Sequence, residues 1–323
     1  MPEAAALARR VVEALERQLL GQRAAIETLV AVYAAGGHAL IEGVPGIGKT
    51  LLARALARLL GLPFARVQFT PDLMPADLLG ANVFDPGSRS FHLVEGPVFT
   101  TVLMADEVNR TPPKTQAALL EAMQERQASI DGVRHELDPG FFVVATQNPF
   151  EFEGTYPLPE AQLDRFLLRI QMGLPEPQSE RALFRAAVED RLVRPEHVAA
   201  IEPVMSSDEA RALRSASRGV HVAPELLEYL ARLVEAVRAL PQFELNVSPR
   251  GALALLEAAR AAALLAERDF VLPDDFKRFV SACWGHRLVL TAEAELEGKT
   301  SASALEDVVR RLEVPHGSFT ARR

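Results

Sequence analysis

The eight residues GVPGIGKT (43–50) have the types and the spacing that bind a chain of phosphates. They match G-x-x-x-x-G-K-[ST] at every fixed position and stand between an apolar run and a helical pattern, as this motif requires. Glycine lets the backbone curl so that successive N–H groups point at phosphate oxygens, and the following helix adds the positive end of its dipole. Lys49 is expected to reach the β- and γ-phosphates, and the Thr50 hydroxyl is expected to bind Mg²⁺. The predicted nucleotide-binding residues are Gly43, Val44, Pro45, Gly46, Ile47, Gly48, Lys49 and Thr50.

Two carboxylates follow the apolar run TVLMA (101–105). At the carboxyl end of a strand beside the phosphate loop, Asp106 would hold the Mg²⁺ ion through its hydration shell, and Glu107 would orient and polarise an attacking water. By itself an Asp-Glu pair after a strand is more often part of a solvated loop. Beside a phosphate loop it indicates ATP hydrolysis, because an enzyme that transfers phosphate to a metabolite would exclude water rather than activate it.

Two further candidates lie in ATQNPFEFEGTYPLPEAQLDRF (145–166). Asn148 ends an apolar run whose strand would lie between the two motif-bearing strands, so its amide would face the γ-phosphate and the water; an Asn before Pro is otherwise a turn former. Arg165 follows on a helical pattern, with Phe166 as an anchor. An arginine at the γ-phosphate is worth ~10³–10⁵ in rate, and in a ring this helix would face the neighbour's nucleotide. A salt bridge or a surface arginine is the alternative.

The last candidate is Arg250, in the segment NVSPRG (246–251). Ser248 is placed to cap a helix that begins at Pro249, so Arg250 would lie in the first turn of a lid helix. From there it could fold down on the γ-phosphate. An ordinary arginine at a helix start is the alternative.

The order of the predicted elements indicates an α/β fold with a parallel sheet. Apolar runs alternate with helical patterns up to about residue 172, which is typical of βαβ units. The segment GLPEPQSE (173–180) then separates an α/β core (1–175) from a helical lid (176–323). Within the core, residues 81–94 and 128–137 are predicted to form β-hairpin insertions; the second has Asp131-Gly132 as its two-residue turn.

Composition restricts the possible partners. The net charge of −8 and the absence of any basic block disfavour a broad nucleic-acid surface. No apolar run approaches the ~18 residues that span a bilayer, and the N-terminal pattern predicts an amphipathic helix rather than a secretory signal. The single cysteine, Cys283, excludes an intramolecular disulfide and has core-like flanks. We therefore expect a cytoplasmic protein with no membrane span.

Taken together, these residues resemble an AAA+ ATPase, and more closely the MoxR family. The resemblance covers most of residues 10–290, and it rests on LIEGVPGIGKT, ADEVNRTPPKTQAALLEAMQE, FFVVATQNPFEFEGTYPLPEAQLDRFLLRI and SPRG. It implies a P-loop NTPase core with an all-α lid, and two hairpins that face a central pore. The implied site consists of Walker A at 43–50, Walker B at Asp106 and Glu107, sensor 1 at Asn148, an arginine finger at Arg165, sensor 2 at Arg250, and Gly21 and Gln22 near the adenine. Asn109, Arg110 and Gln116 match family positions without an assigned role.

The resemblance also implies a function. Such a protein hydrolyses ATP with Mg²⁺ in an oligomeric ring, commonly a hexamer, and remodels, assembles or activates a partner protein, often one with a von Willebrand A domain. An aromatic-hydrophobic-Gly pore loop of the threading ATPases is absent from the sequence. The alternatives are a chelatase-type motor subunit that drives metal insertion into a tetrapyrrole, a nucleic-acid remodelling ATPase, and a nucleotide-gated scaffold with negligible hydrolysis.

Overall fold

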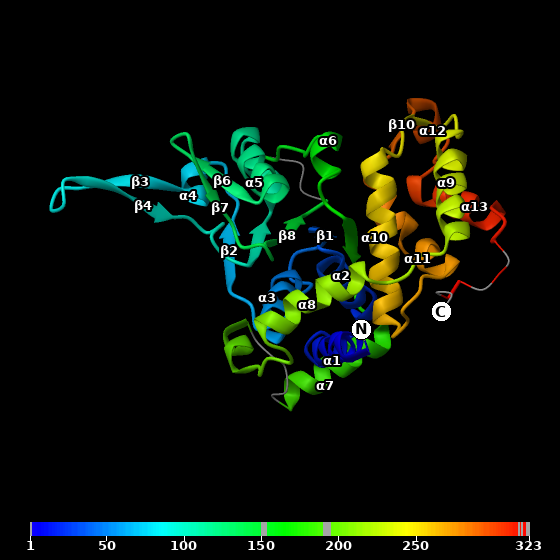
Figure 1. Cartoon of the computed structure of the whole chain (residues 1–323), viewed down its shortest axis with the longest axis horizontal. Helices are drawn as coiled ribbons and strands as arrows, with labels where there is room; N and C mark the ends of the chain where they lie inside the picture. The colour runs from blue at the N-terminus through cyan, green and yellow to red at the C-terminus, as the bar shows by residue number, and fades with distance from the viewer. Residues whose placement is uncertain (1, 150–153, 190–194, 316, 318, 321–323) are drawn as a thin grey trace.

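A five-stranded parallel sheet forms the centre of the molecule (Figure 1). The computed structural model describes residues 2–149, 154–189, 195–315, 317, 319 and 320. The strand order is β2-β5-β8-β1-β9, and every neighbouring pair is parallel. The strands are β1 (Ala39–Gly43), β2 (Phe64–Gln68), β5 (Val102–Asp106), β8 (Phe142–Gln147) and β9 (Leu168–Met172). The fold is therefore α/β with a parallel sheet, as the sequence predicted.

Four of these strands match the apolar runs in the sequence, and β8 lies between β1 and β5 as expected. The fifth strand, β9, was not predicted. It alternates buried and less buried residues at the edge of the sheet, and it follows the helical pattern of residues 161–166 without a glycine or proline to mark its start.

Helices cover both faces of the sheet. Ala39 and Ile41 of β1 pack into one core with the N-terminal helices, whereas Leu40 points into a second core on the opposite face. The helices of the first part are α1 (Pro2–Gln18), α2 (Arg23–Ala35), α3 (Lys49–Leu59), α4 (Pro75–Leu79), η1 (Val108–Arg110), α5 (Pro113–Glu125) and α6 (Glu160–Leu163). In the described part of the chain, no helix is both long and apolar enough to cross a bilayer.

Both predicted hairpins are present. The first consists of β3 (Gly80–Asp85) and β4 (Ser90–Glu95), and it projects far from the body of the molecule (Figure 1). The second consists of β6 (Gln127–Ile130) and β7 (Val133–Glu136), and both residues of its turn have positive φ, as a type I′ turn requires. Asn82 of the first hairpin donates a hydrogen bond to Asp131 of the second (2.9 Å), so the two insertions lie side by side.

The C-terminal part is helical. Its helices are α7 (Pro177–Val188), η2 (Pro195–Ala200), α8 (Ser207–Arg218), α9 (Pro224–Arg238), α10 (Pro249–Leu265), α11 (Pro273–Trp284), α12 (Ala292–Leu296) and α13 (Ser301–Arg311). It also contains a short antiparallel pair that the expectation of an all-α lid did not include, β10 (Phe243–Leu245) and β11 (Val289–Leu290). The domain boundary near residue 175 stays a prediction, since α8 contacts both α2 and α10.

His38, which directly precedes β1, forms hydrogen bonds to both α5 and β8. Its ring is buried, Nε2 lies 3.1 Å from the Met123 carbonyl at the end of α5, and Nδ1 accepts a hydrogen bond from the Val143 N–H of β8 (3.0 Å). The neutral tautomer with hydrogen on Nε2 satisfies both contacts. Burial lowers the pKa of His38 from its ordinary 6.5 to about 3.

This burial makes stability fall as the solution becomes acidic. The unfolded chain binds a proton at His38 below pH 6.5, whereas the folded chain does not until about pH 3. Stability should therefore decrease by about 1.4 kcal/mol per pH unit in that window, or about 2 kcal/mol between pH 6.5 and 5. Urea unfolding at several pH values measures this, and the slope should be smaller in His38→Gln. The matched control is His92→Gln, at an exposed position on β4, which should leave the slope unchanged. Equal slopes in all three proteins would contradict the assignment.

Candidate active site

The phosphate loop connects β1 to α3 with the geometry that its glycines allow. Gly48 is the N-cap of α3 and has φ +100°, a left-handed conformation that side chains disfavour. A Cβ on Gly43 would meet the Met172 carbonyl oxygen of β9 at 2.6 Å, so only glycine lets the two strands approach here. Lys49 Nζ donates to the Gly43 carbonyl across the loop. The loop thus presents the N-terminus of α3 at the carboxyl edge of the sheet, ready for an anion.

The two carboxylates lie at the same edge, joined by a threonine. Asp106 ends β5, and its Oδ1 accepts a hydrogen bond of 2.5 Å from the hydroxyl of Thr146 on β8. The same hydroxyl accepts a hydrogen bond from the Glu107 N–H (2.9 Å). Glu107 itself has φ +58°, a conformation that costs a non-glycine residue about 1–2 kcal/mol. Strain of this kind concentrates at functional positions.

Two side chains of β2 contact the carboxylates as well. Arg66 donates to Asp106 Oδ2 through Nη2 (2.6 Å) and Nε (3.1 Å), and Gln68 Nε2 donates to Glu107 Oε2 (2.8 Å). Arg66 Nη2 also lies 3.1 Å from Gln68 Oε1. Arg66 and Gln68 are two residues apart on the strand and so share one face of it. This pair was not predicted from the sequence, because nothing in the run FARVQF indicates that β2 lies next to β5.

Asn148 lies directly after β8 and is buried. Its position between the phosphate loop and the carboxylates is the one that the strand order predicted. Gln22, at the start of α2, reaches the same edge, since its Nε2 donates to the Gly173 carbonyl just beyond β9 (2.9 Å). Gly21 has φ +76° and packs closely against Ser179. The predicted residues of the phosphate loop, both carboxylates, Asn148 and the Gly21-Gln22 pair are thus brought to one edge.

The three family positions without a predicted role also lie near Glu107. Arg110 Nη1 donates to Glu107 Oε2 (3.2 Å). Gln116 is buried, and its Nε2 lies 3.0–3.1 Å from the carbonyl oxygens of Val108, Thr111 and Tyr156. Gln116 therefore holds both ends of the turn that carries Asn109 and Arg110.

The donor set at this edge fits a hard cation such as Mg²⁺. Asp106 offers carboxylate oxygens and Thr50 a hydroxyl, and Mg²⁺ prefers oxygen ligands while it keeps several waters and binds substrate phosphates. Nowhere in the described residues do three histidine, cysteine or acidic side chains gather into a cluster able to hold a metal. Two protein oxygen ligands, from Asp106 and Thr50, are suited to an ion that binds together with a nucleotide. Arg66 would compete with that ion for Asp106 Oδ2.

Arg165 and Arg250 lie at the opposite side of the sheet from the phosphate loop, where the strands begin. Arg165 is two residues beyond the end of α6 and three residues before the start of β9, and Phe166 beside it is fully buried. It therefore stands in a turn rather than on the predicted helix. Arg250 lies in the first turn of α10, as expected, and Ser248 caps that helix by accepting the Gly251 N–H (3.0 Å). The strands between the two edges have five residues and span about 16 Å. Arg250 is therefore not placed to fold down on the phosphate loop of its own chain.

The two arginines line a common cleft of about 500 Å³. Arg165 Nη1 donates to the Leu120 carbonyl (2.6 Å), while its buried Nε has no hydrogen-bond partner among the described residues. The ionised side chains around the cleft are those of Arg126, Arg165, Arg218, Arg250, Arg287, Asp164 and Glu257. Arg287 and Asp164 pair with each other, which leaves four arginines and one carboxylate around the cleft. This balance favours an anion, and arginine is the side chain best suited to phosphate oxygens.

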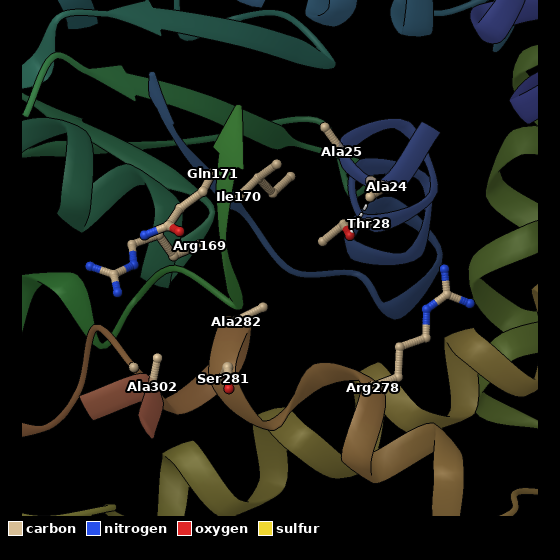
Figure 2. A pocket seen from close by; sticks show the side chains of 11 residues that line it. Ala24, Ala25, Thr28, Arg169, Ile170, Gln171, Arg278, Ser281, Ala282 and Ala302 are labelled. Carbon is tan, nitrogen blue, oxygen red and sulfur yellow. Dashed lines mark hydrogen bonds between the residues drawn. The ribbon is translucent and has the colours of Figure 1, made fainter. Parts of the chain in front are cut away.

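Another cavity, of about 280 Å³, lies between α2, β9 and α11 (Figure 2). Its two arginines, Arg169 and Arg278, lie on opposite sides of it and do not converge on a common point (Figure 2). Arg278 forms an ion pair with Glu27 of α2. We assign no ligand to this cavity. Cys283, buried in the lid as predicted, is no nucleophile either, because burial raises the pKa of its thiol to about 12.

Two family models match this chain, and together they include most of the candidate site residues. The family of ATPases associated with various cellular activities (AAA) matches residues 38–168, which include the phosphate loop, both carboxylates, Asn148 and Arg165. The AAA lid domain matches residues 235–308, which include Arg250.

Individual relatives are more specific. The Bacillus subtilis protein YeaC is 41% identical over 306 residues, 95% of this chain and 94% of that protein. Chaperone MoxR1 of Mycobacterium tuberculosis is 38% identical over 95% of this chain and 82% of its own length, and Protein MoxR of Paracoccus denitrificans is 33% identical over 91% and 92%. A crystal structure from Cytophaga hutchinsonii, described as a proposed ATPase, aligns with a TM-score of 0.87 and 36% identity over 97% of this chain and 98% of that one. The chain belongs to the MoxR family of AAA+ ATPases.

The threonine between the carboxylates was missed in the sequence, where its only signal is a hydroxyl inside an apolar run. In Thr146→Val the side chain keeps its shape but loses both hydrogen bonds, and the partly buried Glu107 N–H loses its acceptor at a cost of about 1–3 kcal/mol. We expect ATP turnover to fall roughly 10- to 100-fold, since a displaced catalytic group loses about that much. Thr146→Ser, which keeps the hydroxyl, is the control and should retain most of the turnover. Wild-type turnover in the valine variant would show that the threonine is dispensable.

Proposed function

We propose that this protein hydrolyses ATP with Mg²⁺ at sites shared between neighbouring copies in a ring, and that it uses the cycle to remodel, assemble or activate a partner protein. The observation that supports this most directly is the division of the site between the two edges of the sheet. The phosphate loop and the carboxylates lie at one edge, and Arg165 and Arg250 lie at the other. Two copies placed head to tail would bring complementary halves together.

In this proposal each residue has a separate task. The loop N–H groups and Lys49 bind the phosphates, while Thr50 and Asp106 hold the ion, which neutralises charge on the β- and γ-phosphates. Glu107 orients the attacking water, and Asn148 hydrogen-bonds to that water and the γ-phosphate. Arg165 and Arg250 of the next copy stabilise the charge that develops as the phosphate bond breaks.

The partner that fits the surface best is a protein. The projecting hairpin exposes Val83, Phe84, Phe91 and Val94, and exposed apolar side chains gathered in this way are typical of protein contacts. The net charge of −8 does not favour nucleic acid. We propose a hexameric ring in the cytoplasm, and a partner with a von Willebrand A domain as the first to be tested.

The role of Glu107 is tested by Glu107→Gln. The amide cannot polarise a water, so turnover should fall by roughly 10²–10⁴-fold, while a fluorescent ATP analogue still binds. The measurements are phosphate release and analogue affinity on the same preparation. Glu3→Gln, at an exposed position of α1, is the control. Unchanged turnover in Glu107→Gln would remove Glu107 from the reaction.

The shared site is tested by mixing inactive variants. Arg165→Ala and Arg250→Ala should each lose turnover, and each should recover when mixed with Glu107→Gln, because Glu107→Gln copies supply the missing arginine to a neighbour with intact carboxylates. In rings assembled at random from equal amounts of two variants, about a quarter of the interfaces join an arginine variant that binds the nucleotide to a Glu107→Gln copy that supplies the arginines. This fraction limits the recovered activity.

A mixture of Arg165→Ala with Arg250→Ala should remain inactive, since one neighbour must supply both arginines. If Arg250 acted on its own chain's nucleotide instead, this last mixture would recover and the mixture of Arg250→Ala with Glu107→Gln would not. Failure of every mixture to recover would count against a shared site.

A further inference from the structure

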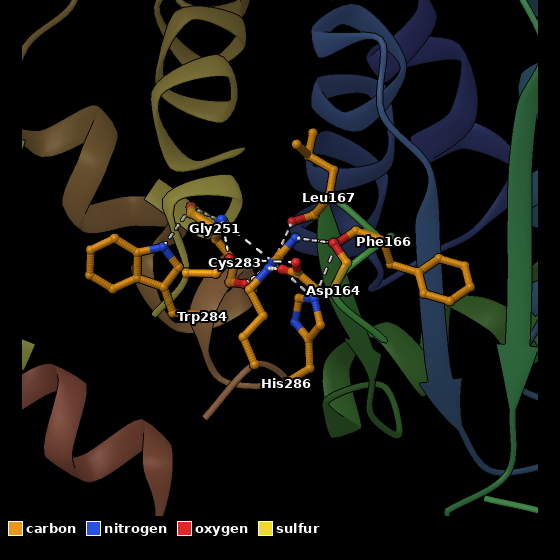
Figure 3. Close-up of polar contacts among 9 residues, drawn as sticks. Asp164, Phe166, Leu167, Gly251, Cys283, Trp284 and His286 are labelled. Atoms are coloured by element: carbon orange, nitrogen blue, oxygen red, sulfur yellow. Dashed lines mark hydrogen bonds and ion pairs between the residues drawn. The ribbon is translucent and has the colours of Figure 1, made fainter. Parts of the chain in front are cut away.

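One buried arginine connects the segment of Arg165 to the lid. Arg287, which follows α11, is 4% exposed. Its hydrogen-bond partners Asp164, Phe166, Leu167 and Cys283 lie close together in Figure 3. Nε donates to Asp164 Oδ1 (2.6 Å), and Nη2 donates to the carbonyls of Asp164 (3.1 Å) and Phe166 (2.7 Å). Nη1 donates to the carbonyls of Leu167 (3.2 Å) and Cys283. A guanidinium has five N–H groups, so each has an acceptor within the chain.

Four of these five acceptors belong to residues 164–167. They lie on both sides of Arg165, one residue before it and one and two residues after it. A single side chain therefore holds the backbone of the turn from which Arg165 projects. The neighbouring ring of His286 is neutral, because burial lowers its pKa well below the ordinary value, and its Nε2 lies 3.2 Å from the Phe166 carbonyl. The ion pair of Arg287 and Asp164 thus meets no competing charge from His286.

The same arginine also touches the segment of Arg250. A Cβ built on Gly251 would lie 3.1 Å from Arg287 Cδ, and the Gly251 carbonyl accepts a hydrogen bond from Trp284 Nε1 (2.9 Å). Ser248, the cap of α10, lies 3.4 Å from Asp164 through its hydroxyl. Arg287 consequently lies between the residues adjacent to Arg165 and the residue adjacent to Arg250.

We propose that Arg287 is a positioning residue that fixes Arg165 and Arg250 relative to one another, so that they reach a neighbour's nucleotide as one rigid pair. Because all five of its N–H groups are engaged within the chain, Arg287 itself binds no phosphate. The lid and the turn of Arg165 then move together rather than independently. This proposal rests on the shared site proposed above.

The experiment combines turnover with mixing. Arg287→Met removes all five donors, and Arg287→Lys keeps the charge but has three donors on one atom, which cannot reach both sides of Arg165. Turnover should fall roughly 10- to 100-fold in the methionine variant, as expected for misplaced groups, while the affinity for a fluorescent ATP analogue stays within about twofold. The lysine variant should lose less.

Mixing separates positioning from a general loss of structure. Arg287→Met should recover with Glu107→Gln, whose copies have intact arginines, and should not recover with Arg165→Ala. A variant that had damaged only its own phosphate loop would show the reverse, recovering with Arg165→Ala and not with Glu107→Gln, and a variant that had lost its structure altogether would recover with neither. The matched control is Arg268→Met, which breaks an equally short, partly buried ion pair in the lid, with Asp275 (2.6 Å), away from the arginine cleft; it should keep its turnover.

The outcomes distinguish this proposal from the shared site itself. If Arg165→Ala recovers with Glu107→Gln but Arg287→Met does not, the positioning role is wrong and the shared site stands. If neither variant recovers, the shared site is wrong, and the positioning role that rests on it is wrong as well. Should Arg287→Met not fold, Arg287→Lys takes its place in the same mixtures, and a lysine variant that also unfolds would overturn the proposal by making Arg287 a residue of general stability.

Discussion

The common direction of the five strands is the constraint on which the rest of this molecule depends. In a parallel sheet every strand ends at the same edge, so the loop after β1, the carboxylates after β5 and the amide after β8 are neighbours. For the same reason, whatever precedes a strand lies at the other edge. Arg165 precedes β9 and therefore cannot lie beside the phosphate loop of its own chain. Under the proposed function these two groups of residues are the halves of one ATPase site, and they face in different directions.

Each half has its own supporting network. At the carboxyl edge, Thr146 joins the two carboxylates, while Arg66 and Gln68 hold them from β2. At the opposite edge, Arg287 holds the turn of Arg165 and contacts the start of α10. In both networks the supporting groups use their hydrogen-bonding capacity within the chain, which is how a protein keeps reacting groups in place before a substrate arrives.

The arrangement also suggests how a nucleotide could act on a partner. The lid helices share one continuous core with α1, α2 and α3, and Arg287 attaches the lid to the turn of Arg165. Loss of a neighbour's γ-phosphate would thus displace the lid and the turn of Arg165 together, rather than a single side chain. The two hairpins, joined through Asn82 and Asp131, project from the same α/β body and expose apolar side chains.

The sequence alone determined the parts whose information is local. A phosphate loop needs eight consecutive residues, a strand with carboxylates at its end is one short pattern, and the Asp131-Gly132 turn needs only two positive φ values. Tertiary structure alone decided that Arg250 and Arg165 line one cleft, that Thr146 bonds to both Asp106 and Glu107, and that Arg287 holds residues 164–167. These contacts join residues about 40 to 120 positions apart, and a contact of that kind leaves no spacing in the chain, because it depends on which elements the packed core brings together.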